Sequence, residues 1–268
     1  MQQDLANINR AYDVDHTVST PFDTDDMILY YKHTTDRDYK LLEMFEGPGL
    51  HSKLDVPHPI RANCGLSLQP AYVLREVASA HAKSVLDVGC GRGFCTFYLA
   101  NLMPDVKFRG VDVVPRHAEF AAQEALKGGY ENVHFSTGDA TRLNELGEKF
   151  DVIFSVEAMC HLDTDQKMRD FLRSAASSLN SKGKIVLVDG FRSPNFDTCS
   201  QNQQLAMMLA ERGFRIRRMP SKALWTTFGS EFGFKLVRDV ELTEHVLPFW
   251  RFGWRFAHAL LRFPWLIR

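Results

Sequence analysis

The stretch at residues 84–93 reads Ser-Val-Leu-Asp-Val-Gly-Cys-Gly-Arg-Gly. Its apolar half, Ser84 to Val88, predicts a buried strand, and Phe94 to Met103 predicts the helix that follows. Glycines at 89, 91 and 93 let the backbone turn tightly and approach a ligand where a Cβ would clash. The helix N-terminus behind them offers unpaired N–H groups to a negatively charged group. The stretch therefore predicts a nucleotide-type ligand site.

The spacing of these glycines narrows the choice of ligand. A dinucleotide fingerprint has G-x-G-x-x-G, whereas this chain has G-x-G-x-G with Asp87 two residues ahead. An acid at that place would repel a diphosphate but suits a ligand with an ammonium group, which disfavours a dehydrogenase. At Leu86 to Gly93 the chain resembles the class I S-adenosylmethionine-dependent methyltransferases. The resemblance implies S-adenosyl-L-methionine as cofactor and S-adenosyl-L-homocysteine as product.

The composition fits a globular protein that is not a general nucleic-acid binder. The 268 residues carry a net charge of −1, without the basic excess expected of such a binder. The five cysteines include no C-x-x-C pair, so neither a disulfide framework nor a zinc site is indicated. No secretory signal and no uncharged apolar stretch of about 18 residues is found, so we expect a cytoplasmic protein. We expect no bound metal.

Predicted strands alternate with amphipathic helices. We expect strands at 106–113, 133–136, 150–156 and 184–188, and helices at 115–125, 165–179, 201–212 and 221–232. This alternation implies a Rossmann-like, doubly wound, mostly parallel sheet with helices on both faces. A sixth strand is predicted to begin at Phe234 to Val237. No seventh, antiparallel strand is found, which departs from the family pattern.

The chain is predicted to divide into four segments. Residues 1–80 form an N-terminal helical cap, 81–192 the S-adenosylmethionine-binding core, 193–248 a substrate-lid insertion with the end of the core, and 249–268 an aromatic and basic C-terminal helix. The last segment has two interpretations: a helix for a membrane surface or partner groove, or a helix docked on its own domain. The shortened sheet edge also predicts a homodimer.

Acids at the ends of predicted strands support the cofactor assignment. Asp112 ends the second strand, where a carboxylate can accept both ribose hydroxyls. The resemblance implies that Asp139 lies at the adenine and Asp87 near the methionine end. The predicted cofactor-binding residues are Asp87, Gly89, Cys90, Gly91, Gly93, Asp112, Val113, Asp139, Ala140 and Glu157.

The candidate catalytic residues, Glu157 and His161, follow the strand at 150–156. This stretch resembles the small-molecule methyltransferases of the sterol, tocopherol and quinone type, where Glu157 would lie beside the transferable methyl. His161 is either a base for an oxygen nucleophile or a structural histidine. No [DNS]-P-P-[FYW] tetrapeptide follows Val156 and no Pro-Cys nucleophile is present, which argues against the DNA-directed branches.

Candidate substrate residues lie in the predicted cap and lid. They are Tyr30, Tyr31, His51, Met207, Met208 and Trp225, and ordinary packing is the alternative for each. The sequence thus predicts methyl transfer to a small, lipophilic acceptor, on oxygen, nitrogen or carbon. The alternative is a protein that binds the same cofactor without methyl transfer, either a cyclase or a pseudo-enzyme that stabilises a partner.

Overall fold

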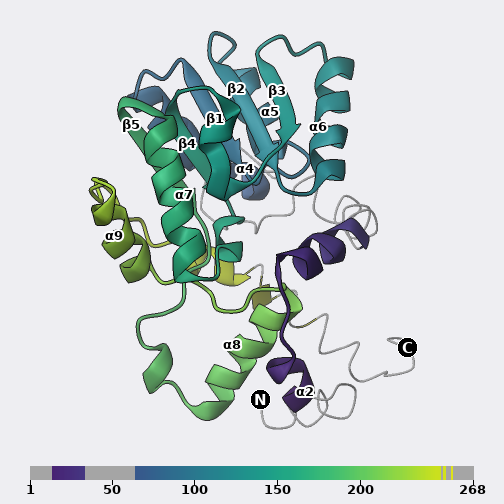
Figure 1. The fold of residues 1–268 in the computed structure, drawn as a ribbon, viewed down its shortest axis with the longest axis vertical. Helices are drawn as coiled ribbons and strands as arrows, with labels where there is room; N and C mark the ends of the chain where they lie inside the picture. The colour runs from purple at the N-terminus through teal and green to yellow at the C-terminus, as the bar shows by residue number, and fades with distance from the viewer. Residues whose placement is uncertain (1–13, 34–63, 249, 252–254, 256–268) are drawn as a thin grey trace.

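The computed structural model describes residues 14–33, 64–248, 250–251 and 255 of the chain (Figure 1). Its centre is a five-stranded sheet in the order β3-β2-β1-β4-β5, with every neighbouring pair parallel. The strands are β1 (Ser84–Val88), β2 (Lys107–Asp112), β3 (Val133–Thr137), β4 (Phe150–Val156) and β5 (Leu179–Val188). The strand order reverses between β1 and β4, and a crevice forms at such a switch point outside the carboxyl ends of the strands.

Helices cover both faces of the sheet, as predicted. One face packs against α4 (Cys64–Ser79), α5 (Phe94–Leu102) and α6 (Pro115–Lys127), and the other against α7 (Asp165–Ser178) and α9 (Lys222–Glu231). In β4, Val152 and Phe154 belong to the core on the α4 and α5 side, whereas Ile153 belongs to the core on the α7 side. Because both faces are buried, the central strands are almost wholly apolar.

A helical cap covers the carboxyl ends of the strands (Figure 1). It consists of α2 (Val14–Ser19), the helical residues 24–33 and α8 (Gln201–Gly213), which are far apart in the sequence. Arg212 joins two of these parts, because its Nε donates to the Val18 carbonyl at 3.1 Å and its guanidinium lies 5.2 Å from the centre of the Phe22 ring. The lid insertion at α8 therefore holds the N-terminal helix in place.

Three short 3-10 helices complete the described elements, namely η1 (Ala140–Leu146), η2 (Met159–His161) and η3 (Phe196–Thr198). Of these, η1 follows β3 and η2 follows β4, so both begin at the edge of the sheet where the crevice forms. Strand β5 begins at Leu179, earlier than predicted, because its first residues pair with β4 before an irregularity in the register.

The predicted sixth strand is wrong. Residues 234–240 form neither strand nor helix, and Leu236 and Val237 are 64% and 82% exposed. An apolar run becomes a strand only where neighbouring backbone supplies hydrogen-bond partners. Here ion pairs hold the segment instead, with Arg238 Nε 3.2 Å from Glu76 and Lys222 Nζ 3.0 Å from Asp239. Within the described residues, no strand follows β5.

Most of the predicted C-terminal helix at 249–268 lies outside the described residues, and so does His51. The basic stripe predicted for the C-terminal helix therefore stays a prediction. The homodimer also stays a prediction. In the part of the chain that the structure describes, no helix has the length and apolar character needed to cross a membrane.

Candidate active site

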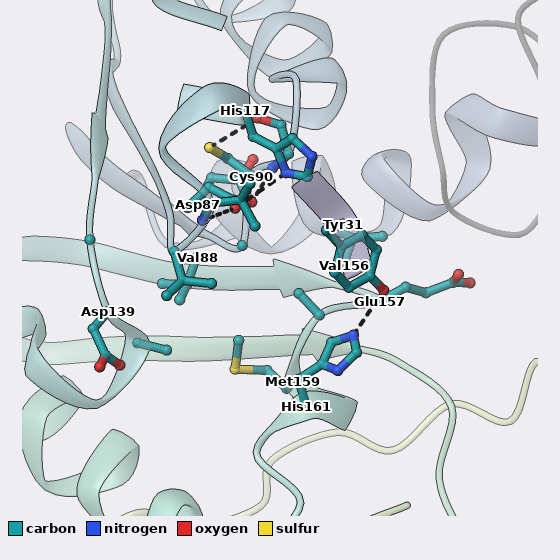
Figure 2. Close-up of a pocket in the computed structure, with 18 of the residues that line it drawn as sticks. Tyr31, Asp87, Val88, Cys90, His117, Asp139, Val156, Glu157, Met159 and His161 are labelled. Atoms are coloured by element: carbon teal, nitrogen blue, oxygen red, sulfur yellow. Dashed lines mark hydrogen bonds and ion pairs between the residues drawn. The ribbon is translucent and has the colours of Figure 1, made fainter. Parts of the chain in front are cut away.

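A cavity of about 290 Å³ lies at the carboxyl ends of β1, β2 and β4, beneath helix 24–33 (Figure 2). Residues from the glycine turn, the ends of three strands and the cap line it together. They include Met27, Tyr31, Asp87, Gly89, Cys90, Gly91, Asp112, Val113, His117, Asp139, Ala140, Glu157, Met159, His161 and Lys167. The cavity therefore lies at the switch point, where ligands bind in open α/β sheets.

The glycine turn after β1 is held against β2. The backbone N–H groups of Gly89 and Cys90 both donate to the Val111 carbonyl, at 2.8 and 3.0 Å. Gly89 has a φ of +75°, and a Cβ there would lie 2.4 Å from the Cβ of Ala158 at the end of β4. Glycine is therefore required where β1 and β4 approach each other, and the turn leaves its backbone open to the cavity.

Asp112 connects the glycine turn with the end of β2. Its carboxylate accepts the N–H of Gly91 at 2.8 Å and the N–H of Val114 at 2.9 Å. The Nδ1 atom of His117 lies 3.3 Å from the same carboxylate. Asp112 is only 7% exposed and lines the cavity. Two backbone donors and the nearby His117 ring thus surround the carboxylate, and it can still accept further hydrogen bonds.

Asp87 is the most deeply buried acid of the site, at 2% exposure. Burial raises its pKa to about 7, against the opposing effect of a 2.6 Å hydrogen bond from the Thr96 hydroxyl. A buried carboxyl of this kind favours a cationic partner, because pairing offsets the cost of its desolvation. The predicted ammonium-binding role of Asp87 stays a proposal.

The Asp87 pKa gives a testable dependence of stability on pH. Its folded-state pKa of about 7 lies above the ordinary value of 3.8, so folding disfavours the charged form. We expect the free energy of unfolding to fall with rising pH, relative to an Asp87→Asn variant, by up to about 1.4 kcal/mol per pH unit between about pH 4 and 7. Urea unfolding of both proteins across this range measures the difference. A difference that is constant with pH would contradict the assignment.

Asp139 lies at the end of β3, where it caps η1. Its carboxylate accepts the backbone N–H and the hydroxyl of Thr141, both at 2.8 Å. Unlike Asp87 and Asp112, it is exposed. The carboxylate and the neighbouring Ala140 both line the cavity, beside the Gly138 backbone. This acid therefore belongs to the outer wall of the site.

Glu157 begins the loop after β4 in an uncommon backbone conformation. Its φ is +50°, in the left-handed region that non-glycine residues rarely adopt. Its Oε1 accepts a 2.7 Å hydrogen bond from Gln69 Nε2 of α4, and its backbone N–H donates to Val188 at 2.8 Å. Such strained residues often mark functional sites.

His161 meets the cap inside the cavity. The Tyr31 hydroxyl lies 3.0 Å from His161 Nε2, and the two rings meet edge to face with centres 5.5 Å apart. Burial, and secondarily Lys167, lowers the pKa of His161 to about 4 against the effect of Asp163. His161 is therefore neutral near pH 7. A neutral imidazole can accept a proton, but a pKa of about 4 makes His161 a weak base at this pH.

Asp189, at the end of β5, fastens the loop that carries His161. Its carboxylate accepts the N–H groups of Cys160 and Gly190, at 3.0 and 2.7 Å. Burial and the neighbouring Glu157 raise its pKa to about 7. Burial also raises the pKa of the Cys90 and Cys160 thiols well above their usual range. Both cysteines are therefore thiols at neutral pH, which suits packing rather than nucleophilic work.

Several predicted site residues lie elsewhere in the fold. Trp225 is 9% exposed and packs edge to face on Phe171 in the core, with ring centres 5.8 Å apart. Met207 and Met208 lie half-buried on α8, which packs against α2. The cavity lining does not include these three residues, Tyr30 or Gly93. A Cβ at Gly93 would lie 2.7 Å from the Phe135 ring, so this glycine serves packing.

Sequence reasoning missed other residues of the site. His117, Met27 and Lys167 line the cavity and Gln69 donates to Glu157, but none of these residues belongs to a sequence motif. For His117, the sequence did offer one indication: it follows Asp112 at the start of the next predicted helix.

The fold is that of the class I S-adenosylmethionine-dependent methyltransferases, as predicted. A family model described as a methyltransferase domain matches residues 79–229, and the chain belongs to this family. The geranyl diphosphate C-methyltransferase of Streptomyces coelicolor A3(2), solved with Mg²⁺, a substrate analogue and S-adenosyl-L-homocysteine, superposes with a TM-score of 0.70. That match covers 87% of each chain at 16% identity.

Curated relatives share parts of the sequence. Phosphoethanolamine N-methyltransferase 1 of Triticum aestivum is 32% identical over 49% of this chain, and the match spans only a quarter (25%) of that protein. A probable chloroplastic tocopherol O-methyltransferase of Oryza sativa subsp. japonica is 26% identical over 70% of this chain and 54% of its own length. An S-adenosyl-L-methionine-dependent Diels-Alderase of Talaromyces variabilis is 24% identical over 61% of this chain and 57% of its own.

Proposed function

We propose that this protein binds S-adenosyl-L-methionine and transfers its methyl group to a small-molecule acceptor. The observation that carries the proposal is the placement of Asp87, Asp112 and Asp139 around one cavity that the glycine turn also lines. Three acids at the ends of adjacent strands match the ammonium, ribose and adenine parts of this cofactor. Family membership and the superposed methyltransferase support the same conclusion.

In this proposal each part of the cofactor has its own residues. Asp112 accepts the ribose hydroxyls, Asp139 and Ala140 contact the adenine, and Asp87 supports the ammonium end. Glu157 and the backbone of Gly89 lie toward the methyl group. Two observations support this fit of the residues to the cofactor: the glycine turn lines the cavity, and two carboxylates beside it are deeply buried.

When bound, the cofactor supplies a methyl group carried on a sulfonium. A nucleophile of the acceptor takes this methyl group by in-line attack, and S-adenosyl-L-homocysteine leaves. The protein mainly contributes alignment and the exclusion of water. Helix 24–33 closes over the cavity and places the Tyr31 hydroxyl on His161. His161 lines the same cavity and is the candidate to accept a proton from an oxygen nucleophile of the acceptor, although its pKa of about 4 makes it a weak base. The alternative is a structural role for His161, because its hydrogen bond with the Tyr31 hydroxyl also holds helix 24–33 in place.

The cavity has to hold the cofactor as well as the acceptor. Its volume of about 290 Å³ lies at the lower end of the range for ligand pockets, roughly 300–1,000 Å³. Met27, Phe94, Met159 and Leu162 give it apolar walls, with Tyr31, His161 and Lys167 as the polar groups near the cap. This mixture suits a largely apolar acceptor with one polar end, and helix 24–33 has to move for the acceptor to enter.

The proposal predicts S-adenosyl-L-homocysteine binding that does not depend on His161. We expect wild type and His161→Ala to bind this product equally in calorimetry, because His161 lies at the acceptor end. With an acceptor found by screening for S-adenosyl-L-homocysteine release, His161→Ala should slow turnover if the histidine is a base. Absence of binding in the wild type would contradict the proposed function.

The Diels-Alderase relative keeps one alternative open, a cofactor-binding protein that performs a different reaction. The two functions differ in their product. A methyltransferase releases one S-adenosyl-L-homocysteine for each turnover of the acceptor, whereas a cyclase leaves S-adenosyl-L-methionine unchanged. Binding without release across an acceptor panel would favour the alternative.

A further inference from the structure

The ring of Tyr31 lies between two histidines that come from different parts of the fold (Figure 2). Its centre is 5.5 Å from the His161 ring at an angle of 86°, and 6.2 Å from the His117 ring at 73°. Both are edge-to-face arrangements in the range where aromatic pairs attract. The cap helix therefore contacts the loop after β4 through one histidine and helix α6 through the other.

His117 is fixed at the start of α6. Its backbone N–H donates to the Val114 carbonyl at 3.0 Å, and the residue is 5% exposed. Its Nδ1 lies 3.3 Å from Asp112 Oδ1, the oxygen that also accepts the Val114 N–H. The other oxygen, Oδ2, accepts the N–H of Gly91. The glycine turn, the start of α6 and His117 thus together fix the orientation of the carboxylate.

We propose that His117 is a positioning residue with two separable tasks: its Nδ1 orients Asp112 toward the cofactor ribose, and its ring seats Tyr31 of the cap. The inference rests on the proposed function, in which Asp112 accepts the ribose hydroxyls. Because the Tyr31 hydroxyl also meets His161, one histidine links the cofactor end of the cavity with the acceptor end.

The two tasks depend on different atoms, so two substitutions separate them. His117→Asn keeps a side-chain amide where Nδ1 stands but removes the ring that Tyr31 contacts. His117→Phe keeps a ring for Tyr31 but has no donor for Asp112, and His117→Leu replaces it as the donor-free variant if the phenylalanine variant does not fold. Tyr31→Leu removes the ring contact from the other side and leaves Asp112 untouched.

Calorimetry with S-adenosyl-L-homocysteine tests the first task. We expect His117→Asn and Tyr31→Leu to bind within about twofold of wild type, and the donor-free variant to bind about tenfold more weakly, as for loss of a hydrogen bond to a charged group. Hydrogen–deuterium exchange of residues 24–33 at saturating product tests the second. It should be about threefold to tenfold faster in His117→Asn and Tyr31→Leu, the size of an aromatic pair, and unchanged in His117→Phe.

The outcomes are distinguishable. If the wild type does not bind S-adenosyl-L-homocysteine, the proposed function itself is wrong. If the wild type binds it and the donor-free variant binds equally well, His117 does not orient Asp112. If exchange of residues 24–33 in His117→Asn equals that of the wild type, His117 does not seat the cap. A general loss of packing would instead weaken binding and speed exchange in every His117 variant alike, and that result would also overturn the inference.

Discussion

Replacement of Asp112 by alanine is expected to weaken S-adenosyl-L-homocysteine binding at least about a hundredfold. The carboxylate is 7% exposed and already oriented by Gly91, Val114 and His117. In the proposed function it accepts two ribose hydroxyls, and each hydrogen bond to a charged group contributes about 1.5–3 kcal/mol. A loss of about 3 kcal/mol already exceeds a hundredfold in affinity. Calorimetry measures it directly.

Two further variants show whether the loss comes from the ribose contact. Asp112→Asn keeps the shape of the side chain and one acceptor oxygen, so its affinity should lie between those of wild type and Asp112→Ala. Asp139→Ala is the matched control at the end of the neighbouring strand, because Asp139 is exposed and mainly caps η1. We expect Asp139→Ala to lose about tenfold or less. Equal affinities in Asp112→Ala and wild type would refute the ribose assignment.

Replacement of Gly89 by alanine is expected to lower the free energy of unfolding by about 3 kcal/mol. Two costs add. The φ of +75° costs an L-residue about 1–2 kcal/mol. The new Cβ would also lie 2.4 Å from the Cβ of Ala158, and overpacking of this kind costs about 1–3 kcal/mol. Urea unfolding without ligand measures the sum.

Gly129 provides the matched control, because its φ is +66° and, among the described residues, no neighbouring atom lies within 4 Å of the point where a Cβ would stand. Gly129→Ala should therefore cost only the backbone term, about 1–2 kcal/mol. Adding Ala158→Gly to Gly89→Ala removes the clashing atom and should recover part of the lost stability. If Gly89→Ala costs no more than Gly129→Ala, the close approach of β1 and β4 is not as described.

Local sequence patterns were sufficient for the sheet. Strand β4 was predicted with its observed bounds, Phe150 to Val156, because a fully buried strand is a continuous apolar run between polar ends. The wrong strand prediction at residues 234–237 came from the same pattern. That run is equally apolar, but a strand also needs a partner backbone, and no short stretch of sequence states whether one is present.

The acids that line the cavity could be predicted because they are tied to strand ends. Asp87, Asp112 and Asp139 each follow or end a strand, and parallel strands bring those ends to one edge of the sheet. The other candidates were predicted with mixed success. Tyr31 and His161 were both candidates and both line the cavity, whereas Trp225 was a candidate and lies in the core. The sequence did not show that Tyr31 and His161 meet, because 130 residues separate them.

The doubly wound sheet, the glycine turn and the acids around it follow from the sequence, because they depend on apolar periodicity and on residues adjacent to strands. The contacts between side chains of separate helices required the folded structure. Tyr31 meets His161 and Gln69 meets Glu157 because whole helix faces pack together. Contacts between such distant segments follow from the geometry of the folded chain, since no spacing within the sequence encodes them.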